Sequence, residues 1–222
     1  MTLDGPRWGP RSKGKSQQLV VLCHGVGADG NDLIDLGPSF FGHALPDAAF
    51  VSPHAPFPFD QAPMGRQWFS LSDRTPAMMA DGVRIAADHL MRFVTAELAR
   101  LELPEDAFAL MGFSQGAMTS LFAGLRRTPT PRAILAYSGA LLSPETLAAE
   151  IKGRPPVLLA HGEADPVVPV AASRQAEQVL TAIGVPVEAV YAPRLQHGID
   201  EGGLAAGALM LQRAFSPAGR TQ

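Results

Sequence analysis

The chain has 222 residues, with 18 Lys and Arg against 21 Asp and Glu, and a formal net charge of −3. A chain of this length is typical of one large domain. We expect residues 1–222 to form a single domain in which residues 1–17 make an N-terminal arm or hairpin. The charge balance lacks the basic excess that nucleic-acid binding requires. Because Cys23 is the only cysteine, an intramolecular disulfide and a cysteine-built zinc site are excluded.

The N-terminal segment MTLDGPRWGPRSKGKSQQ is polar and has no apolar core, unlike a signal peptide. No stretch of the sequence approaches the roughly 18 unbroken apolar residues that a membrane helix needs. We therefore expect a cytoplasmic protein with no integral membrane segment and no nucleic-acid partner.

Short apolar runs alternate with segments of helical periodicity along the chain. Six runs are nearly continuous in apolar character, as in strands buried on both faces of a parallel sheet: residues 19–23, 48–51, 107–112, 133–137, 157–160 and 187–191. Apolar residues at three- and four-residue spacing predict helices over residues 78–101, 115–126, 172–183 and 204–215. This alternation predicts an α/β fold with a mostly parallel central sheet flanked by helices. Residues 53–77 lack periodicity, which in a compact domain often marks part of a site.

The sharpest motif is GFSQG at residues 112–116, which matches G-x-S-x-G. It lies between the strand predicted at residues 107–112 and the helix predicted at residues 115–126, as a nucleophile elbow requires. Such a turn exposes the hydroxyl of Ser114 at the carboxyl edge of the sheet. The N-terminus of the following helix then faces any negative charge that forms there. The alternative is a turn that merely contains glycine and serine, but the strand before it and the helix after it favour the nucleophile.

A serine hydroxyl needs a base, and in such folds the order along the chain is Ser, Asp or Glu, then His. Of the six histidines, only His197 lies between the last predicted strand and the last predicted helix. Asp165 follows the strand at residues 157–160, and Glu163 in the same segment competes with it for the role of the acid. We favour Asp165 because the PVVP that follows it fixes the chain. A lone histidine in a loop is more often a surface residue than a base, and a lone aspartate before proline is more often a turn former or a helix cap. The prediction therefore rests on the joint order of Asp165 and His197 after Ser114.

The segment after the first predicted strand also allows a second interpretation. Three glycines match the dinucleotide fingerprint G-x-G-x-x-G: Gly25, Gly27 and Gly30. Three aspartates crowd the place of the pyrophosphate and would repel it: Asp29, Asp32 and Asp35. The fingerprint further needs an acid that closes the second strand, where this chain has VSPH. A nicotinamide-dependent oxidoreductase is therefore disfavoured.

The same segment, HGVG at residues 24–27, is better interpreted as an oxyanion loop. A serine hydrolase with a nucleophile elbow uses two backbone N–H donors that face the developing negative oxygen. The candidates here are the N–H groups of Gln115 and Val26. Loss of one such donor typically costs roughly 3–4 kcal/mol in barrier. His24 and His161 each close a strand and precede a glycine, so we expect them to be structural residues beside the site.

Five segments in this order resemble the phospholipase/carboxylesterase family of α/β-hydrolases, which includes bacterial carboxylesterases and eukaryotic acyl-protein thioesterases. They are LDGPRW at residues 3–8, HGVGADGNDL at 24–33, RQWF at 66–69, GFSQG at 112–116 and HGEADPVVP at 161–169. The resemblance covers nearly the whole chain. It implies an α/β-hydrolase fold with little or no lid domain.

For the site, the resemblance implies a triad of Ser114, Asp165 and His197, with Val26 and Gln115 as oxyanion donors. It also implies that the loop around Trp68 lies beside the acyl pocket, so we expect the site wall to contain Met64, Trp68 and Phe69. The chain departs from the family at Gln196, where members commonly carry a glycine before the catalytic histidine.

The sequence thus predicts a serine carboxylesterase that works through an acyl-enzyme, without a metal or an organic cofactor. Its expected partner is a small-molecule ester. Thioesters and lysophospholipids remain open as substrates, and so does a homodimeric state. The alternative from a different class is a non-catalytic ligand-binding protein on the same fold.

Overall fold

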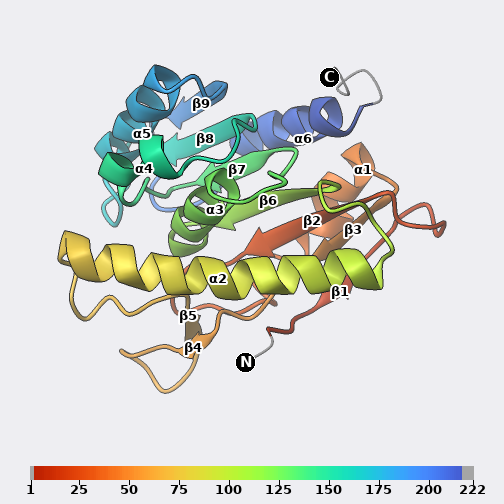
Figure 1. Cartoon of the computed structure of the whole chain (residues 1–222), viewed down its shortest axis with the longest axis horizontal. Helices are drawn as coiled ribbons and strands as arrows, with labels where there is room; N and C mark the ends of the chain where they lie inside the picture. Colours follow the sequence, from red (N-terminus) through yellow and green to blue (C-terminus); the bar gives the residue numbers. More distant parts are fainter. Residues whose placement is uncertain (1–2, 217–222) are drawn as a thin grey trace.

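A computed structural model of the protein describes residues 3–216. Its centre is a seven-stranded sheet with the strand order β1-β3-β2-β6-β7-β8-β9 (Figure 1). The strands are β1 (Arg7–Trp8), β2 (Gln18–Cys23), β3 (Ala48–Val51), β6 (Phe108–Phe113), β7 (Ile134–Tyr137), β8 (Val157–Gly162) and β9 (Val187–Ala192). β1 is antiparallel to β3, and every other neighbouring pair is parallel. The prediction of a mostly parallel sheet is therefore confirmed.

All six predicted strands occur, with ends that differ from the expected ones by two residues at most. The continuous apolar runs form strands because β2, β3, β6, β7 and β8 are buried on both faces, so nearly every position must be apolar. β1 was not predicted as a strand. Two residues are too few to show a periodic pattern, and β1 forms only because the edge of β3 is available to it.

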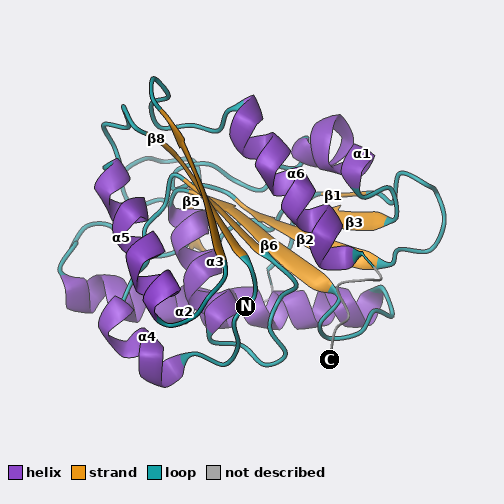
Figure 2. Ribbon diagram, turned by 90° about the horizontal axis from the view of Figure 1, so that it is seen from above, coloured by secondary structure: helices purple, strands orange, loops and turns teal. Residues whose placement is uncertain are grey.

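Helices cover both faces of the sheet (Figure 2). One face carries α2 (Pro76–Arg100), α3 (Gln115–Leu125), α4 (Pro144–Glu150) and α5 (Val170–Ala182). The other face carries a π-helical turn at Gly37–Phe41, the short α1 (Gly42–Ala44) and α6 (Glu201–Phe215). The four predicted helices are α2, α3, α5 and α6, each found within three residues of its expected ends. The segments at residues 37–44 and 144–150 are too short to have shown a helical period.

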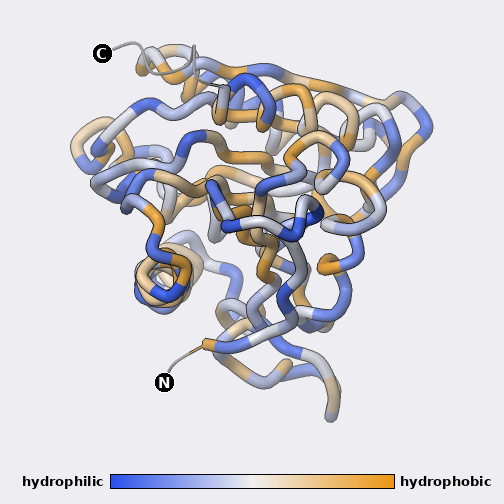
Figure 3. The backbone as a smooth tube through the Cα atoms, turned by 90° about the vertical axis from the view of Figure 1, so that its right-hand side faces the viewer, coloured by the Kyte–Doolittle hydropathy of each residue, from blue (hydrophilic) through white to orange (hydrophobic). Residues whose placement is uncertain are grey.

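The apolar stripe of each long helix faces the sheet. Val83, Leu90 and Val94 of α2 are fully buried in a cluster that includes Val21 and Leu110 of the sheet. Alternate side chains of the same strands point to the opposite face and pack against α6. The hydropathy colouring of Figure 3 accordingly places hydrophobic segments in the interior of the molecule.

Residues 53–77, expected to be a loop without regular structure, contain a small hairpin. β4 (Phe57–Pro58) pairs antiparallel with β5 (Arg66–Gln67). The strands are again only two residues long, so the sequence pattern could not reveal them. The hairpin bonds to the glycine-rich loop after β2, because Arg66 N–H donates to the Ala28 carbonyl at 2.8 Å and Gly27 N–H donates to the Arg66 carbonyl at 2.8 Å.

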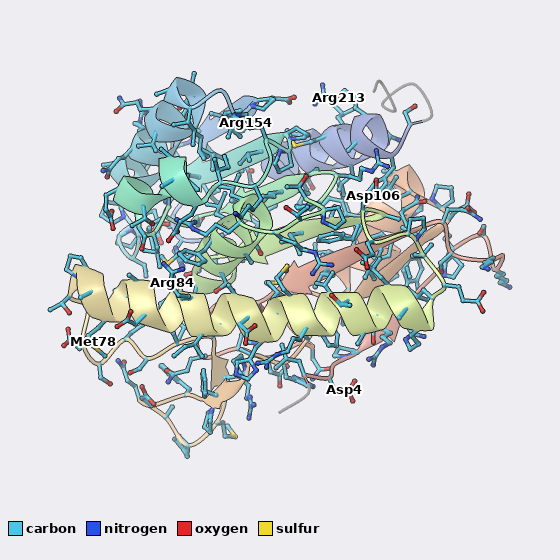
Figure 4. The ribbon with its side chains drawn as sticks, in the orientation of Figure 1. Asp4, Met78, Arg84, Asp106, Arg154 and Arg213 are labelled. Carbon is cyan, nitrogen blue, oxygen red and sulfur yellow. The ribbon has the colours of Figure 1, made fainter. Side chains whose placement is uncertain are left out.

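The N-terminal arm is fixed by a buried carboxylate. Glu97 on α2 has a side chain that is only 5% exposed, and it accepts hydrogen bonds from Arg7 at 2.7 and 3.0 Å and from Arg100 at 2.9 Å. Arg7 also pairs with Asp4, which Figure 4 labels on the arm below α2. Burial opposes ionisation of Glu97, but the two guanidinium groups outweigh it and hold the pKa of this carboxyl below its usual value.

Replacing Arg7 with Met is therefore expected to lower the free energy of unfolding at pH 7 by about 1–3 kcal/mol. A depressed carboxyl pKa contributes stability above the unfolded-state value and loses it as the pH falls. The difference between the two proteins should thus shrink below about pH 4.5, where Glu97 becomes protonated in the unfolded chain. Urea unfolding at several pH values measures this. A difference that persists unchanged at pH 3 would contradict the role given to the ion pair.

Candidate active site

Ser114 stands at a sharp turn between β6 and α3. Its backbone has φ 53° and ψ −118°, a sparsely populated conformation with positive φ that costs a non-glycine residue about 1–3 kcal/mol. The turn needs small neighbours, because a Cβ at Gly112 would collide with the Gly116 carbonyl and a Cβ at Gly116 would collide with the Cys23 carbonyl. These are the two glycines of the G-x-S-x-G motif, and the structure explains both by close backbone contact.

His197 approaches the serine from the loop between β9 and α6. Its Nε2 lies 3.0 Å from the Ser114 Oγ, and its ring packs at 4.8 Å between centroids against Phe113. The loop is held because Ser138 Oγ–H donates to the Gly198 carbonyl at 3.0 Å. Gln196, where the family commonly has glycine, is not among the residues with positive φ. A side chain at this position therefore brings no backbone strain.

Asp165 completes a line of three side chains. Its Oδ2 lies 2.7 Å from Nδ1 of His197, and its Oδ1 accepts the backbone N–H groups of Val167 and Val168 at 2.8 and 2.9 Å. Burial of the carboxyl opposes its ionisation. The hydrogen bonds from His197 and the two backbone groups outweigh burial and hold the pKa of Asp165 below its usual value.

These contacts also fix where the protons lie. An ionised carboxylate can only accept, so Nδ1 of His197 carries the proton that Asp165 binds. Nε2 of the neutral ring is then the acceptor for the Ser114 hydroxyl. The arrangement can draw a proton from the serine as its oxygen attacks, and it can stabilise the imidazolium that results.

Glu163, the competing acid, lies on the surface. Its carboxylate forms an ion pair with Arg174 of α5 at 2.5 Å and its side chain is 35% exposed. Of the two acids, Asp165 is the one in contact with His197.

The glycine-rich loop reaches the serine, since a Cβ on Gly25 would lie 3.5 Å from the Ser114 Cβ. Most of its backbone donors are engaged within the protein, including the N–H groups of Gly27, Ala28, Gly30 and Asn31. Within residues 3–216, neither the N–H of Val26 nor that of Gln115 donates a hydrogen bond to another residue. These two groups remain available for an external oxyanion, whereas a loop with occupied donors is poorly suited to cradle a pyrophosphate.

The sequence predicts a function only for the backbone of Gln115, but the buried side chain of this residue connects the hairpin to the site. Its Oε1 accepts the Trp68 N–H at 2.8 Å, and its Nε2 donates to the Phe69 carbonyl at 2.7 Å. The Trp68 indole N–H in turn donates to the His24 carbonyl at 2.9 Å. A glutamine after Ser114 gives no periodic signal in the sequence, so only the fold shows these contacts of its side chain.

His24 lies beside the site as a structural residue. Its Nε2 accepts the Ala55 N–H at 3.0 Å and its Nδ1 donates to the Gly25 carbonyl at 2.7 Å. Burial lowers the pKa of the His24 imidazole, which agrees with a neutral ring that both donates and accepts.

The three residues expected in the site wall occupy different environments. Trp68 is fully buried, Phe69 is 2% exposed, and Met64 is 81% exposed at the tip of the hairpin. Phe69 lines an apolar hollow of about 420 Å³ between the hairpin and α2, together with Phe57 and Ile85. Their contact with a substrate stays a prediction.

Fold and site geometry together define an α/β hydrolase. The chain matches the model of the phospholipase/carboxylesterase family over residues 10–212, and it belongs to that family. It is 31% identical over 186 residues to esterase YpfH of Escherichia coli (strain K12), covering 83% of this chain and 78% of that protein.

Two further comparisons point the same way. Acyl-protein thioesterase 1 of Gibberella zeae is 27% identical over 194 residues, which cover 80% of this chain and 82% of the thioesterase. The crystal structure of esterase PE8 superposes with a TM-score of 0.90 at 38% identity, covering 97% of this chain and 100% of that one. Within the part of the chain that the structure describes, no helix is long and apolar enough to cross a membrane.

Gly116→Ala is expected to lower the free energy of unfolding by about 2–3 kcal/mol, because the new Cβ has to displace the backbone of β2. The matched control is Gly202→Ala in the first turn of α6, where the nearest atom to a Cβ is a carboxylate oxygen of Asp200 at 3.6 Å. That change should be neutral or stabilising by up to about 1 kcal/mol. Urea unfolding compares the two variants, and equal stability would contradict the close approach.

Proposed function

We propose that this protein is a serine hydrolase of carboxylic esters that works through an acyl-enzyme. One observation carries the proposal: Ser114, His197 and Asp165 form a continuous hydrogen-bonded line with contacts of 3.0 and 2.7 Å. An activated serine has no use in a protein that only binds ligands, so the same line argues against the non-catalytic alternative.

The proposed reaction follows from the proton positions. Ser114 Oγ attacks the ester carbonyl while His197 Nε2 takes its proton, and the charged imidazole is stabilised by Asp165. His197 then gives that proton to the leaving alcohol, and the acyl group stays on the serine. In the second half His197 draws a proton from water, the hydroxide attacks the acyl-enzyme, and the proton returns to Ser114 as the acid leaves.

The oxyanion of each tetrahedral intermediate is assigned to the N–H groups of Val26 and Gln115. The first comes from the loop after β2, and the second is at the N-terminus of α3, whose dipole favours negative charge. Both lie next to the serine in the fold and lack an internal acceptor among the described residues. The catalysis proposed here needs no metal or organic cofactor.

The acyl side of the substrate is assigned to the region of the β4–β5 hairpin. The hollow beside Phe69 is lined mainly by aromatic and aliphatic side chains, which suit an acyl chain better than a polar group. Thioesters are included in the proposal, since their carbonyl presents the same electrophile and one relative is named as an acyl-protein thioesterase.

The nucleophile is tested with Ser114→Ala. This variant is expected to lose at least about 10⁴-fold in turnover while keeping its unfolding midpoint, because only the attacking hydroxyl is removed. Hydrolysis is measured on oxyesters and thioesters of graded acyl length, which also defines substrate preference. A fluorophosphonate probe should label one equivalent of the native protein and none of the variant. Absence of labelling in the native protein would support the non-catalytic alternative.

The acid is tested by a matched pair of isosteric substitutions. Asp165→Asn should cut turnover by about 10⁴-fold, because an amide favours the wrong imidazole tautomer. Glu163→Gln removes the neighbouring carboxylate that pairs with Arg174 and should leave turnover within about threefold of the native value. Steady-state rates on the same ester compare them, and the reverse order of effects would assign the acid to Glu163.

A further inference from the structure

One buried imidazole beside the triad has no part in the proposed reaction. His161 is near the end of β8, and its side chain has no exposed surface. Its Nε2 lies 3.2 Å from the Oδ2 of Asp165, the carboxylate oxygen that lies 2.7 Å from Nδ1 of His197. Two imidazoles therefore converge on a single carboxylate oxygen.

The partners of His161 determine its tautomer. The Val168 carbonyl lies 2.8 Å from Nε2 and can only accept, so Nε2 carries a proton. Nδ1 lies 2.6 Å from Oγ of Ser173 on α5, whereas the other acceptor near that hydroxyl, the Gly139 carbonyl, is 3.4 Å away. The hydroxyl proton of Ser173 thus goes to Nδ1, and the ring is neutral with its own proton on Nε2.

We propose that His161 is a positioning residue whose Nε2–H, which donates to the Val168 carbonyl, also faces Oδ2 of Asp165 and thereby sets how strongly that carboxylate stabilises a charged His197. The inference rests on the proposed function of the triad. Oδ1 of Asp165 is already held by two backbone N–H groups, so His161 acts on Oδ2. The partial positive charge on the Nε2–H of His161 offsets part of the negative charge on the oxygen that faces His197, and the imidazolium is then stabilised less.

The other ionisable groups around this cluster are engaged elsewhere. Tyr137 of β7 donates to the Gly203 carbonyl, and Tyr191 of β9 donates to Glu177 of α5. Glu163, in the loop after β8, pairs with Arg174 of α5. Among the hydrogen bonds of residues 3–216, the side-chain donor to Asp165 is His197, and Nε2 of His161 lies 3.2 Å from the same carboxylate oxygen. The charge on Oδ2 therefore depends on these two rings.

Two substitutions of similar polarity separate the positioning role from a structural one. In His161→Gln the amide nitrogen can reach the place of Nε2, whereas in His161→Asn it reaches only as far as Nδ1. In the Asn variant the acidic limb of the kcat/KM profile is expected to move to higher pH by about half a unit, with KM unchanged. In the Gln variant the limb should stay at the native position.

A hydroxyl deletion provides a second test in case the Asn variant does not fold. Ser173→Ala weakens Nε2–H as a donor and should move the limb in the same direction by a smaller amount. Ser52→Ala, the control, deletes a buried hydroxyl that donates to the Leu22 carbonyl at 2.9 Å, and it should not move the limb. The inference would be overturned if the acidic limb of the kcat/KM profile lay at the same pH in the two His161 variants, or if it moved to lower pH in His161→Asn. It would also be overturned if the limb lay at the same pH in the two serine variants.

A measurement without substrate keeps the inference separate from the proposed function. The proton between Asp165 and His197 should give a strongly deshielded NMR resonance, which moves further downfield in His161→Asn and stays in place in His161→Gln. A native protein that shows this pattern but hydrolyses no ester would overturn the proposed function and leave the inference standing. A resonance with the same position in both variants would overturn the inference.

Discussion

The approach of α3 to the carboxyl ends of β2 and β6 is the constraint on which the rest of the structure depends. Gly116 lies directly against the Cys23 carbonyl, and Gly112 lies against Gly116, so no side chain fits between helix and sheet. This contact accompanies the positive-φ conformation of the chain at Ser114. The Ser114 N–H donates to the Tyr137 carbonyl at 2.9 Å, which helps to hold the strained turn in place. Close packing thus sustains a conformation that local preference opposes.

Parallel strands explain why residues so distant in sequence meet. The carboxyl ends of β2, β6 and β8 lie at one edge of the sheet, and the loops that follow them carry Val26, Ser114 and Asp165. The loop after β9, the last strand of the sheet, brings His197 to the same edge. Each loop needs only a short excursion to reach its neighbours, so the geometry of the site follows from the order of the strands.

Buried polar side chains orient much of the backbone around this edge of the sheet. His24 donates to the Gly25 carbonyl, which belongs to the same peptide unit as the Val26 N–H. A peptide unit is planar, so fixing its carbonyl also fixes the direction in which its N–H points. The Gln115 side chain binds the backbone on both sides of the Trp68–Phe69 peptide in a similar way. Buried polar side chains here act on the main chain, which suits a site whose proposed electrophilic groups are backbone N–H donors.

The sequence by itself determined the longer helices and strands and the order of the proposed reacting groups. Continuous apolar runs identified the buried strands, helical periodicity identified the long helices, and G-x-S-x-G placed Ser114 between β6 and α3. These signals are local, because burial on two faces and a tight turn each restrict residue type within a short window. The order Ser, Asp, His then singled out Asp165 and His197, with Glu163 left as a competitor.

Only the tertiary structure shows which of the two acids contacts His197, and only it reveals the supporting contacts. Glu163 and Asp165 are two positions apart, and the direction of each side chain depends on the path of the chain after β8, which brings Asp165 to His197 and turns Glu163 toward Arg174. His161 contacts Asp165, and the Gln115 side chain bonds to the hairpin backbone. The residues next to these groups in the sequence do not predict either contact. Such contacts depend on the angle and distance between packed elements, which residue patterns within one element do not encode.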